Sequence, residues 1–128
     1  MRDTTGQAKV LGIIDSYTKA LETGDAELWE SLYWLDDPGF SEIKNDKPHP
    51  LDRRYIEQIA AWLRKNGPSK PNQRWYDTRV FFLSPDVAYS ISLRDEFNTG
   101  ITSRVTLVYL RKAGQWRIIH GHFSDVPK

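Results

Sequence analysis

The spacing of hydrophobic residues changes once along the chain, and this change limits the folds that the sequence can adopt. Between residues 7 and 66, apolar residues recur every three or four positions, as they do in amphipathic helices. From Arg74 onward they alternate with polar residues, as in strands with two different faces. Helices followed by a series of strands are typical of α+β proteins, so we predict helices packed on a mostly antiparallel sheet.

Three helices are predicted in the first half, over residues 7–22, 26–33 and 53–66. Gly24 is expected to end the first helix, Asp25 to cap the second and Asp52 to open the third. A short strand over residues 40–44 and a proline-containing loop over residues 45–50 separate the second helix from the third. The first half therefore supplies a helical layer and one short strand.

Four long strands are predicted in the second half, over residues 74–83, 87–97, 101–111 and 115–124. The connections between them are short and contain Pro85, Gly100 and Gly114, which are turn residues. Consecutive strands joined by short turns form an antiparallel meander, and long strands twist and curl. A curled sheet that is only partly covered by three helices would form a cone with an internal cavity.

The composition excludes several classes of protein. The 128 residues correspond to one domain, residues 1–128, with residues 1–6 expected as a flexible N-terminus and 125–128 as a tail. The 18 basic and 17 acidic residues leave no basic excess, so we expect no nucleic-acid partner. No cysteine and no apolar run of membrane-spanning length occur, which favours a cytoplasmic protein without membrane contact.

Two segments resemble the nuclear-transport-factor-2-like superfamily, and specifically its SnoaL-like branch. The segment Ser16-Tyr17-Thr18-Lys19-Ala20-Leu21-Glu22-Thr23-Gly24-Asp25 is similar to the first-helix signature of the superfamily. The segment Gly114-Gln115-Trp116-Arg117-Ile118-Ile119-His120-Gly121-His122-Phe123-Ser124 is similar to the last strand of the SnoaL-like branch. The order of predicted elements between them also matches, so the resemblance covers nearly the whole chain.

The resemblance implies a cystatin-like α+β roll, in which a cone-shaped, mostly antiparallel sheet wraps around the N-terminal helix. It also implies a pocket for a small hydrophobic molecule and a homodimer formed through the outer face of the sheet. Members of this superfamily include ketosteroid isomerases, polyketide cyclases, dehydratases, transport adaptors and association domains. The fold therefore does not determine the function.

Tyr17 and Glu42 are the residues that we predict to be catalytic. The resemblance to the isomerase branch places Tyr17 at the tyrosine that donates a hydrogen bond to an oxyanion, and Glu42 near the general base. A phenol suits the first role because it donates while neutral, and a carboxylate in an apolar pocket can carry a proton. The alternatives are that Tyr17 is a core residue and that Glu42 faces solvent. A slip of one residue would replace Glu42 with Ser41.

The third member of the isomerase site is missing. That branch has a buried, protonated acid on the penultimate strand, and the matching position here is Thr106. A hydroxyl group is a weaker donor than a carboxylic acid, so steroid isomerisation itself is disfavoured. The residues that we expect to line the pocket for ligand binding are Trp34, Tyr55, Ile59, Tyr89, Thr106, Ile119 and Phe123.

His120 and His122 share one face of the last predicted strand and could suggest a metal. A third ligand is missing, because His49 in a loop is the only other histidine, so we predict no metal and no cofactor. The alternation that directs Ile119, Gly121 and Phe123 into the pocket directs the histidines outward. Trp116 and Ile118 would accompany them at the dimer face, unless a bulge exchanges the two faces.

The function that we predict is that of a small-molecule pocket protein. One hypothesis is a cofactor-independent isomerase, cyclase or dehydratase that acts on a hydrophobic carbonyl compound through Glu42 and Tyr17. The alternatives are a non-catalytic ligand-binding or association module and a small subunit of a larger enzyme. The sequence leaves open whether the protein is an enzyme.

Overall fold

The computed structural model of the protein describes residues 4–127, and its helices and strands follow the predicted order. The two classes of element form an α+β fold, which confirms the prediction from hydrophobic spacing. None of the described helices is long and apolar enough to cross a membrane. The elements are α1 (Thr4–Thr23), α2 (Ala26–Ser31), β1 (Ser41–Lys44), α3 (Arg53–Asn66), β2 (Gln73–Ser84), β3 (Val87–Glu96), β4 (Thr102–Lys112) and β5 (Gln115–Asp125).

The chain ends differ slightly from expectation. Helix α1 begins at Thr4, so residues 4–6, which were expected to be flexible, are helical. Strand β5 continues to Asp125, the first residue of the expected tail. Residues 1–3 and 128 lie outside the described residues.

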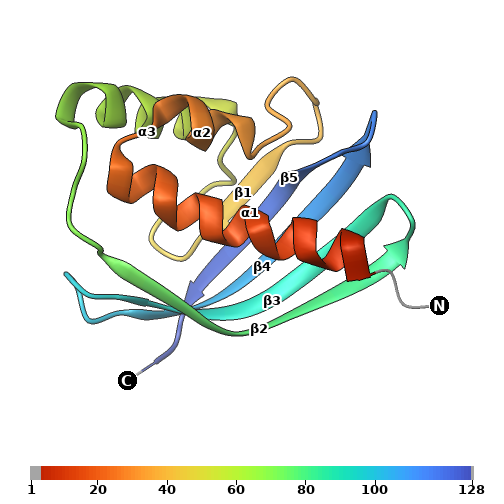
Figure 1. The fold of residues 1–128 in the computed structure, drawn as a ribbon. Helices are drawn as coiled ribbons and strands as arrows, with labels where there is room; N and C mark the ends of the chain where they lie inside the picture. The colour runs from red at the N-terminus through yellow and green to blue at the C-terminus, as the bar shows by residue number, and fades with distance from the viewer. Residues whose placement is uncertain (1–3, 128) are drawn as a thin grey trace.

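The sheet has the strand order β1-β5-β4-β3-β2. Strands β2 to β5 form the predicted antiparallel meander, and β1 joins its edge by pairing in parallel with β5. Figure 1 shows that the sheet is strongly curved and that α1 lies across its concave face. Irregular pairing between Tyr76 and Arg79 and between Val108 and Tyr109 contributes to this curvature, because bulges bend strands.

Strand β3 turns its polar residues inward. Ala88, Ser90, Ser92 and Arg94 are buried beneath the helices, whereas the apolar residues between them face outward. Small side chains leave room for the large rings that the helices place on this face. The hydroxyl groups find partners inside: Ser90 bonds to the Tyr109 hydroxyl at 2.8 Å, and Ser92 to Thr78 at 2.7 Å.

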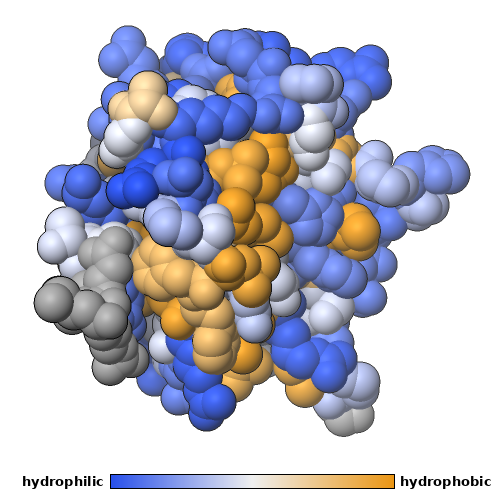
Figure 2. All heavy atoms as spheres, turned by 90° about the vertical axis from the view of Figure 1, so that its right-hand side faces the viewer, coloured by the Kyte–Doolittle hydropathy of each residue, from blue (hydrophilic) through white to orange (hydrophobic). Residues whose placement is uncertain are grey.

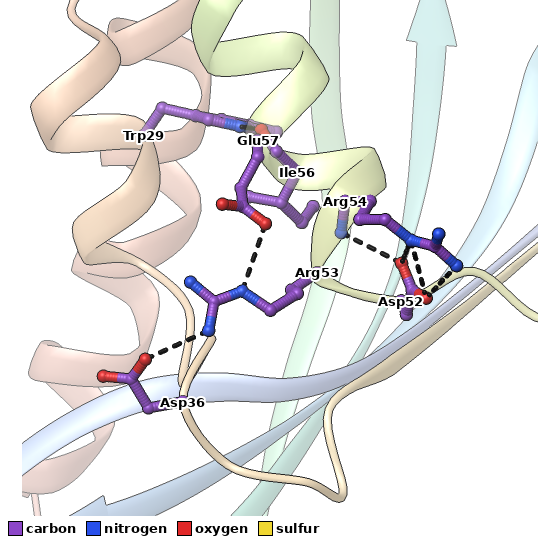
Figure 3. A network of polar contacts seen from close by, with 7 residues as sticks. All are labelled: Trp29, Asp36, Asp52, Arg53, Arg54, Ile56 and Glu57. Carbon is purple, nitrogen blue, oxygen red and sulfur yellow. Dashed lines mark hydrogen bonds and ion pairs between the residues drawn. The ribbon is translucent and has the colours of Figure 1, made fainter.

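A polar network holds the start of α3 in place (Figure 3). Asp52 accepts a hydrogen bond from the backbone N–H of Arg54 and so caps the helix. Arg53 bridges Glu57, one turn later, and Asp36 in the loop after α2. The indole of Trp29 in α2 donates to the backbone oxygen of Ile56 at 3.1 Å. These contacts hold α3 beside α2 and so position Tyr55 near β1.

Candidate functional site

The side chain of Glu42 lies inside the protein and is only 2% exposed. Strand β1 pairs Glu42 with Gly121 of β5, and a methyl group at position 121 would approach the Glu42 Oε1 atom to 3.0 Å and the Phe123 ring to 3.3 Å. The missing side chain at Gly121 therefore makes room for the carboxyl group beside Phe123. The Oε2 atom has no hydrogen-bond partner among the described residues. A buried, unpaired carboxyl group is costly for stability and typical of a functional site.

Aromatic rings from three elements surround Tyr17 and Tyr33. The Tyr17 ring meets the rings of Trp29 and Trp75 edge to face, with centroids 4.8 and 5.2 Å away. Tyr33, whose buried hydroxyl group has no partner among residues 4–127, packs against Trp29 and Phe40 in the same way. These contacts hold the rings of Tyr17 and Tyr33 in fixed orientations on the inner face.

Burial is the main cause of the pKa shifts of Glu42, Tyr17 and Tyr33. It raises the pKa of Glu42 from 4.5 to about 7, although the nearby charges of Lys44 and Arg94 act in the opposite direction. Burial also raises the pKa values of Tyr17 and Tyr33 above the ordinary value, and the charge of Glu42 adds to both increases. Glu42 can therefore change protonation state near neutral pH while the phenols remain hydrogen-bond donors.

A cavity of about 270 Å³ opens at one end of the inner face. Tyr55 and Phe123 contribute aromatic surface to it, and Lys44, Arg94 and Ser103 contribute polar groups. Two of the predicted pocket residues, Tyr55 and Phe123, thus lie in one cavity. Glu42 is not among the residues that line this cavity, but its carboxyl group and the Phe123 ring both lie next to Gly121.

Tyr89 and Thr106, also predicted as pocket residues, lie on the outer face, which contradicts their predicted placement. Tyr89 pairs with Phe81 across the β2–β3 ladder and stacks on it, with ring centroids 5.0 Å apart. Thr106 pairs with Ile91 and His122, which are also outward-facing residues. The prediction assumed that the apolar residues of β3 face the pocket. In the structure the alternate residues, Ala88, Ser90, Ser92 and Arg94, face inward.

Trp34 lies far from the cavity, at the β4–β5 hairpin end of the sheet. Its indole donates to the backbone oxygen of Leu110 at 2.8 Å, and its ring contacts the cations of Lys112 and Arg117. The expectation that Trp34 lines the pocket is therefore wrong. Ile59 packs against the core from α3 and does not line the cavity.

A bulge in β5 changes the predicted faces of its first half. Because Val108 pairs with His120 and Tyr109 with Ile118, Ile119 is the extra residue in β5 and packs half-buried against the core. Trp116 and Ile118 therefore lie in the core, not at the outer face as predicted.

His120 and His122 do lie on the outer side, where His120 Nδ1 is 2.9 Å from the Ser41 hydroxyl oxygen. Within residues 4–127, no three His, Asp or Glu side chains form a metal-binding group.

The sequence analysis did not identify Tyr33, Lys44 and Arg94 as site residues. Tyr33 is the last residue of the predicted helix 26–33, and a helix prediction does not reveal where a hydroxyl group points. Lys44 follows Glu42 by two positions in a strand, and this spacing places both on one face. Arg94 belongs to a run of small inward residues, but its face was clear only from the whole sheet.

Comparison with known proteins agrees with this architecture. A family model described as a SnoaL-like domain matches residues 10–128. No curated protein matches the chain. One similar solved structure is an NTF-2 like protein of unknown function from Silicibacter pomeroyi, with 19% identity, a TM-score of 0.74, and coverage of 98% of this chain and 100% of that chain.

Two further solved structures share the fold. A cystatin-like fold protein from Burkholderia xenovorans has 22% identity and a TM-score of 0.70, with 94% of this chain and 92% of that chain covered. A proposed ketosteroid isomerase from Parabacteroides distasonis has 21% identity and a TM-score of 0.63, with 89% and 85% covered. At these identities the likeness concerns the fold alone. Because the family model matches almost the entire sequence, the chain belongs to the SnoaL-like domain family of the NTF2-like superfamily.

Proposed function

We propose that this protein is a cofactor-independent enzyme that moves a proton on a small carbonyl compound, with Glu42 as the base. The observation that carries this proposal is the buried Glu42 carboxyl group, whose Oε2 atom has no partner in the part of the chain that the structure describes and whose pKa is raised to about 7. A structural role would require a partner for such a group. A base that alternates between protonation states at neutral pH requires this kind of environment.

In the proposed reaction, the Glu42 carboxylate removes a proton from the carbon next to the carbonyl group. The C–H electron pair moves into the new C=C bond, and the carbonyl oxygen becomes an enolate oxygen. Tyr17 donates a hydrogen bond to that oxygen, because its raised pKa keeps the phenol protonated. Glu42 then returns the proton to the same carbon or to another one, which gives exchange or isomerisation.

Deuterium uptake from D₂O tests this proposal without knowledge of the natural substrate. With 2-tetralone and benzylacetone as probes, NMR should show enzyme-dependent loss of the protons next to the carbonyl group. We expect Glu42→Gln to slow this exchange by about 100-fold, at the lower end of what a positioned proton-transfer group contributes. The wild-type rate should rise with pH through about 7, because only the ionised Glu42 carboxylate accepts a proton.

Glu27→Gln is the matched control, because Glu27 is an exposed glutamate in α2. It should leave the exchange rate unchanged. Enzyme-dependent exchange that is equal in the wild type and in Glu42→Gln would exclude Glu42 as the base. Bound probes with no enzyme-dependent exchange would favour the ligand-binding module.

We also propose that two copies associate through the outer face of the sheet. Phe81 and Ile91 are 40% and 38% exposed on this face, and no helix covers them. Figure 2, which views the end of the molecule that holds the β2–β3 turn and the start of α1, shows a separate band of hydrophobic side chains at that end. A second copy presents the same outer face, so a two-fold contact would cover both apolar faces at once.

Replacing Ile91 with lysine should convert the dimer into a monomer, because it places a charge in the centre of the proposed contact. Light scattering coupled to gel filtration measures the mass directly. Trp62→Lys is the control, because Trp62 is 53% exposed on α3, away from this face. A monomeric wild-type protein, or an Ile91→Lys variant that stays dimeric, would contradict this interface.

A further inference from the structure

The cavity beside Glu42 contains two positively charged groups whose polar atoms are incompletely satisfied. The Lys44 ammonium group forms no hydrogen bond or ion pair with the residues that the structure describes. It contacts only aromatic rings, at 4.1 Å from the Phe123 centroid and 5.3 Å from the Tyr55 centroid. Arg94 is 6% exposed, and its Nε atom has no partner within residues 4–127. A buried hydrogen-bond donor without an acceptor lowers the stability of the fold. The Arg94 Nε atom therefore lacks an acceptor that a bound ligand could supply.

Both cations line the cavity, and they are near enough for the charge of Arg94 to lower the pKa of Lys44. The Arg94 guanidinium is 4.8 Å from the centroid of the same Phe123 ring that Lys44 contacts. They come from β1 and β3, which are separated in the sheet by β5 and β4, and both line the cavity. One small ligand in the cavity can therefore reach both.

The acidic groups of the cavity lining are already occupied. Glu96 accepts a hydrogen bond from Arg94 Nη2 at 2.6 Å. Asp125 accepts from Asn45 at 3.2 Å and from Ser103 at 3.5 Å. Asp46 lies 3.9 Å from the ammonium group of Lys47. Among the described residues, none of these carboxylates forms a hydrogen bond or ion pair with Lys44 Nζ or Arg94 Nε, so these two atoms remain available, although Arg94 is ion-paired with Glu96 through Nη2.

We propose that the cavity binds the carboxylate of a small keto acid between Lys44 and Arg94. This inference rests on the proposed function, because the keto group of the same molecule would then face Glu42. Charge-assisted hydrogen bonds from an ammonium and a guanidinium group are the strong contacts for a carboxylate. The rings of Tyr55 and Phe123 would cover the apolar part of the ligand.

Both cations also influence Glu42, which places the carboxylate site and the base in one electrostatic environment. Lys44 and Arg94 each lower the pKa of Glu42, and Arg94 also lowers that of Tyr17. The pKa of Lys44 is itself lowered, first by burial, although Glu42 opposes this change. A bound carboxylate would stabilise the ammonium form of Lys44 that its surroundings disfavour.

The probe for this inference is 3-benzoylpropanoate, compared with its uncharged amide, which has the same length and the same ring. Titration at pH 8, followed by calorimetry, should show that the wild type binds the acid at least tenfold more tightly than the amide. Lys44→Gln should reduce this preference to threefold or less. Lys44 is suited to substitution because it forms no ion pair with the described residues. Lys70→Gln, a change of an exposed lysine in the loop between α3 and β2, should retain the full preference.

Arg94→Lys is the second variant, because it retains the positive charge and removes the Nε donor. It should weaken binding of the acid and leave binding of the amide unchanged. A wild type that binds both compounds equally, or neither, would overturn the inference, and so would a Lys44→Gln variant with the full preference.

Deuterium exchange at the carbon next to the ketone, measured in the same samples, separates this inference from the proposed function. If the acid is preferred but Glu42→Gln exchanges at the wild-type rate, the proton-transfer proposal fails and the carboxylate site stands. If the amide exchanges in a Glu42-dependent way and the acid is not preferred, the carboxylate site fails and the base stands.

Discussion

Replacing Trp29 with alanine is expected to lower the free energy of unfolding by about 3–5 kcal/mol, the typical cost of removing a large aromatic side chain from a core. Trp29 is 1% exposed and touches both site tyrosines, with ring centroids 4.8 Å from Tyr17 and 5.2 Å from Tyr33. It also donates to Ile56 in α3. The substitution would therefore leave a cavity between α1, α2 and α3 and remove one contact between helices.

Urea unfolding, monitored by circular dichroism, measures this loss. Trp62→Ala is the matched control: the chemical change is the same, but Trp62 is 53% exposed, so we expect a change within about 0.5 kcal/mol. If Trp29→Ala still folds, the rate of deuterium exchange into the ketone probes should also fall, because the Tyr17 ring loses one of its two edge-to-face neighbours. Equal stabilities of the two variants would show that Trp29 is not the central packing residue of the helical layer.

The order of elements and the inward position of Glu42 could be predicted from the sequence, because both depend on local information. Helical spacing before residue 66 and alternation after Arg74 determine the element types, and Gly24 and Asp25 mark a helix boundary. The inward side chain of Glu42 agrees with the expectation that the resemblance implied. Each of these inferences depends on a few neighbouring residues or on one short motif.

Which face a strand residue occupies could not be predicted with the same success. Tyr89 was placed inside because apolar residues usually face a core, but β3 buries its small and charged residues instead. Thr106 was placed inside because it matches the buried acid of the isomerase branch, but it pairs with outward-facing residues. One extra residue at Ile119 reverses the faces of Trp116 and Ile118 relative to a regular strand. The inward position of Arg94 follows from the same inversion. The face of a strand residue and the position of a bulge depend on pairing between strands that are distant in the sequence, and hydrophobic periodicity does not reveal this pairing.

Replacing Glu42 with glutamine is expected to stabilise the protein at pH 8 and to leave its stability unchanged near pH 4. Burial raises the pKa of the folded Glu42 carboxyl group from 4.5 to about 7. Between these values the folded state holds a proton that the unfolded state has released, so the stability falls as the pH rises. At about 1.4 kcal/mol for each pKa unit, the complete loss above pH 7 is about 3 kcal/mol.

Glutamine has nearly the same shape and carries no charge at any pH, so the variant avoids this loss. Urea unfolding of both proteins at pH 4 and pH 8 measures the difference, and the other titrating groups cancel because both proteins contain them. Glu27→Gln, at an exposed site in α2, should change stability by less than about 0.5 kcal/mol at either pH. A difference of the same size at both pH values would mean that the Glu42 carboxyl group does not titrate differently on folding. A gain in stability at pH 8 together with lost proton exchange would show that the protein retains a destabilising charge for its chemistry.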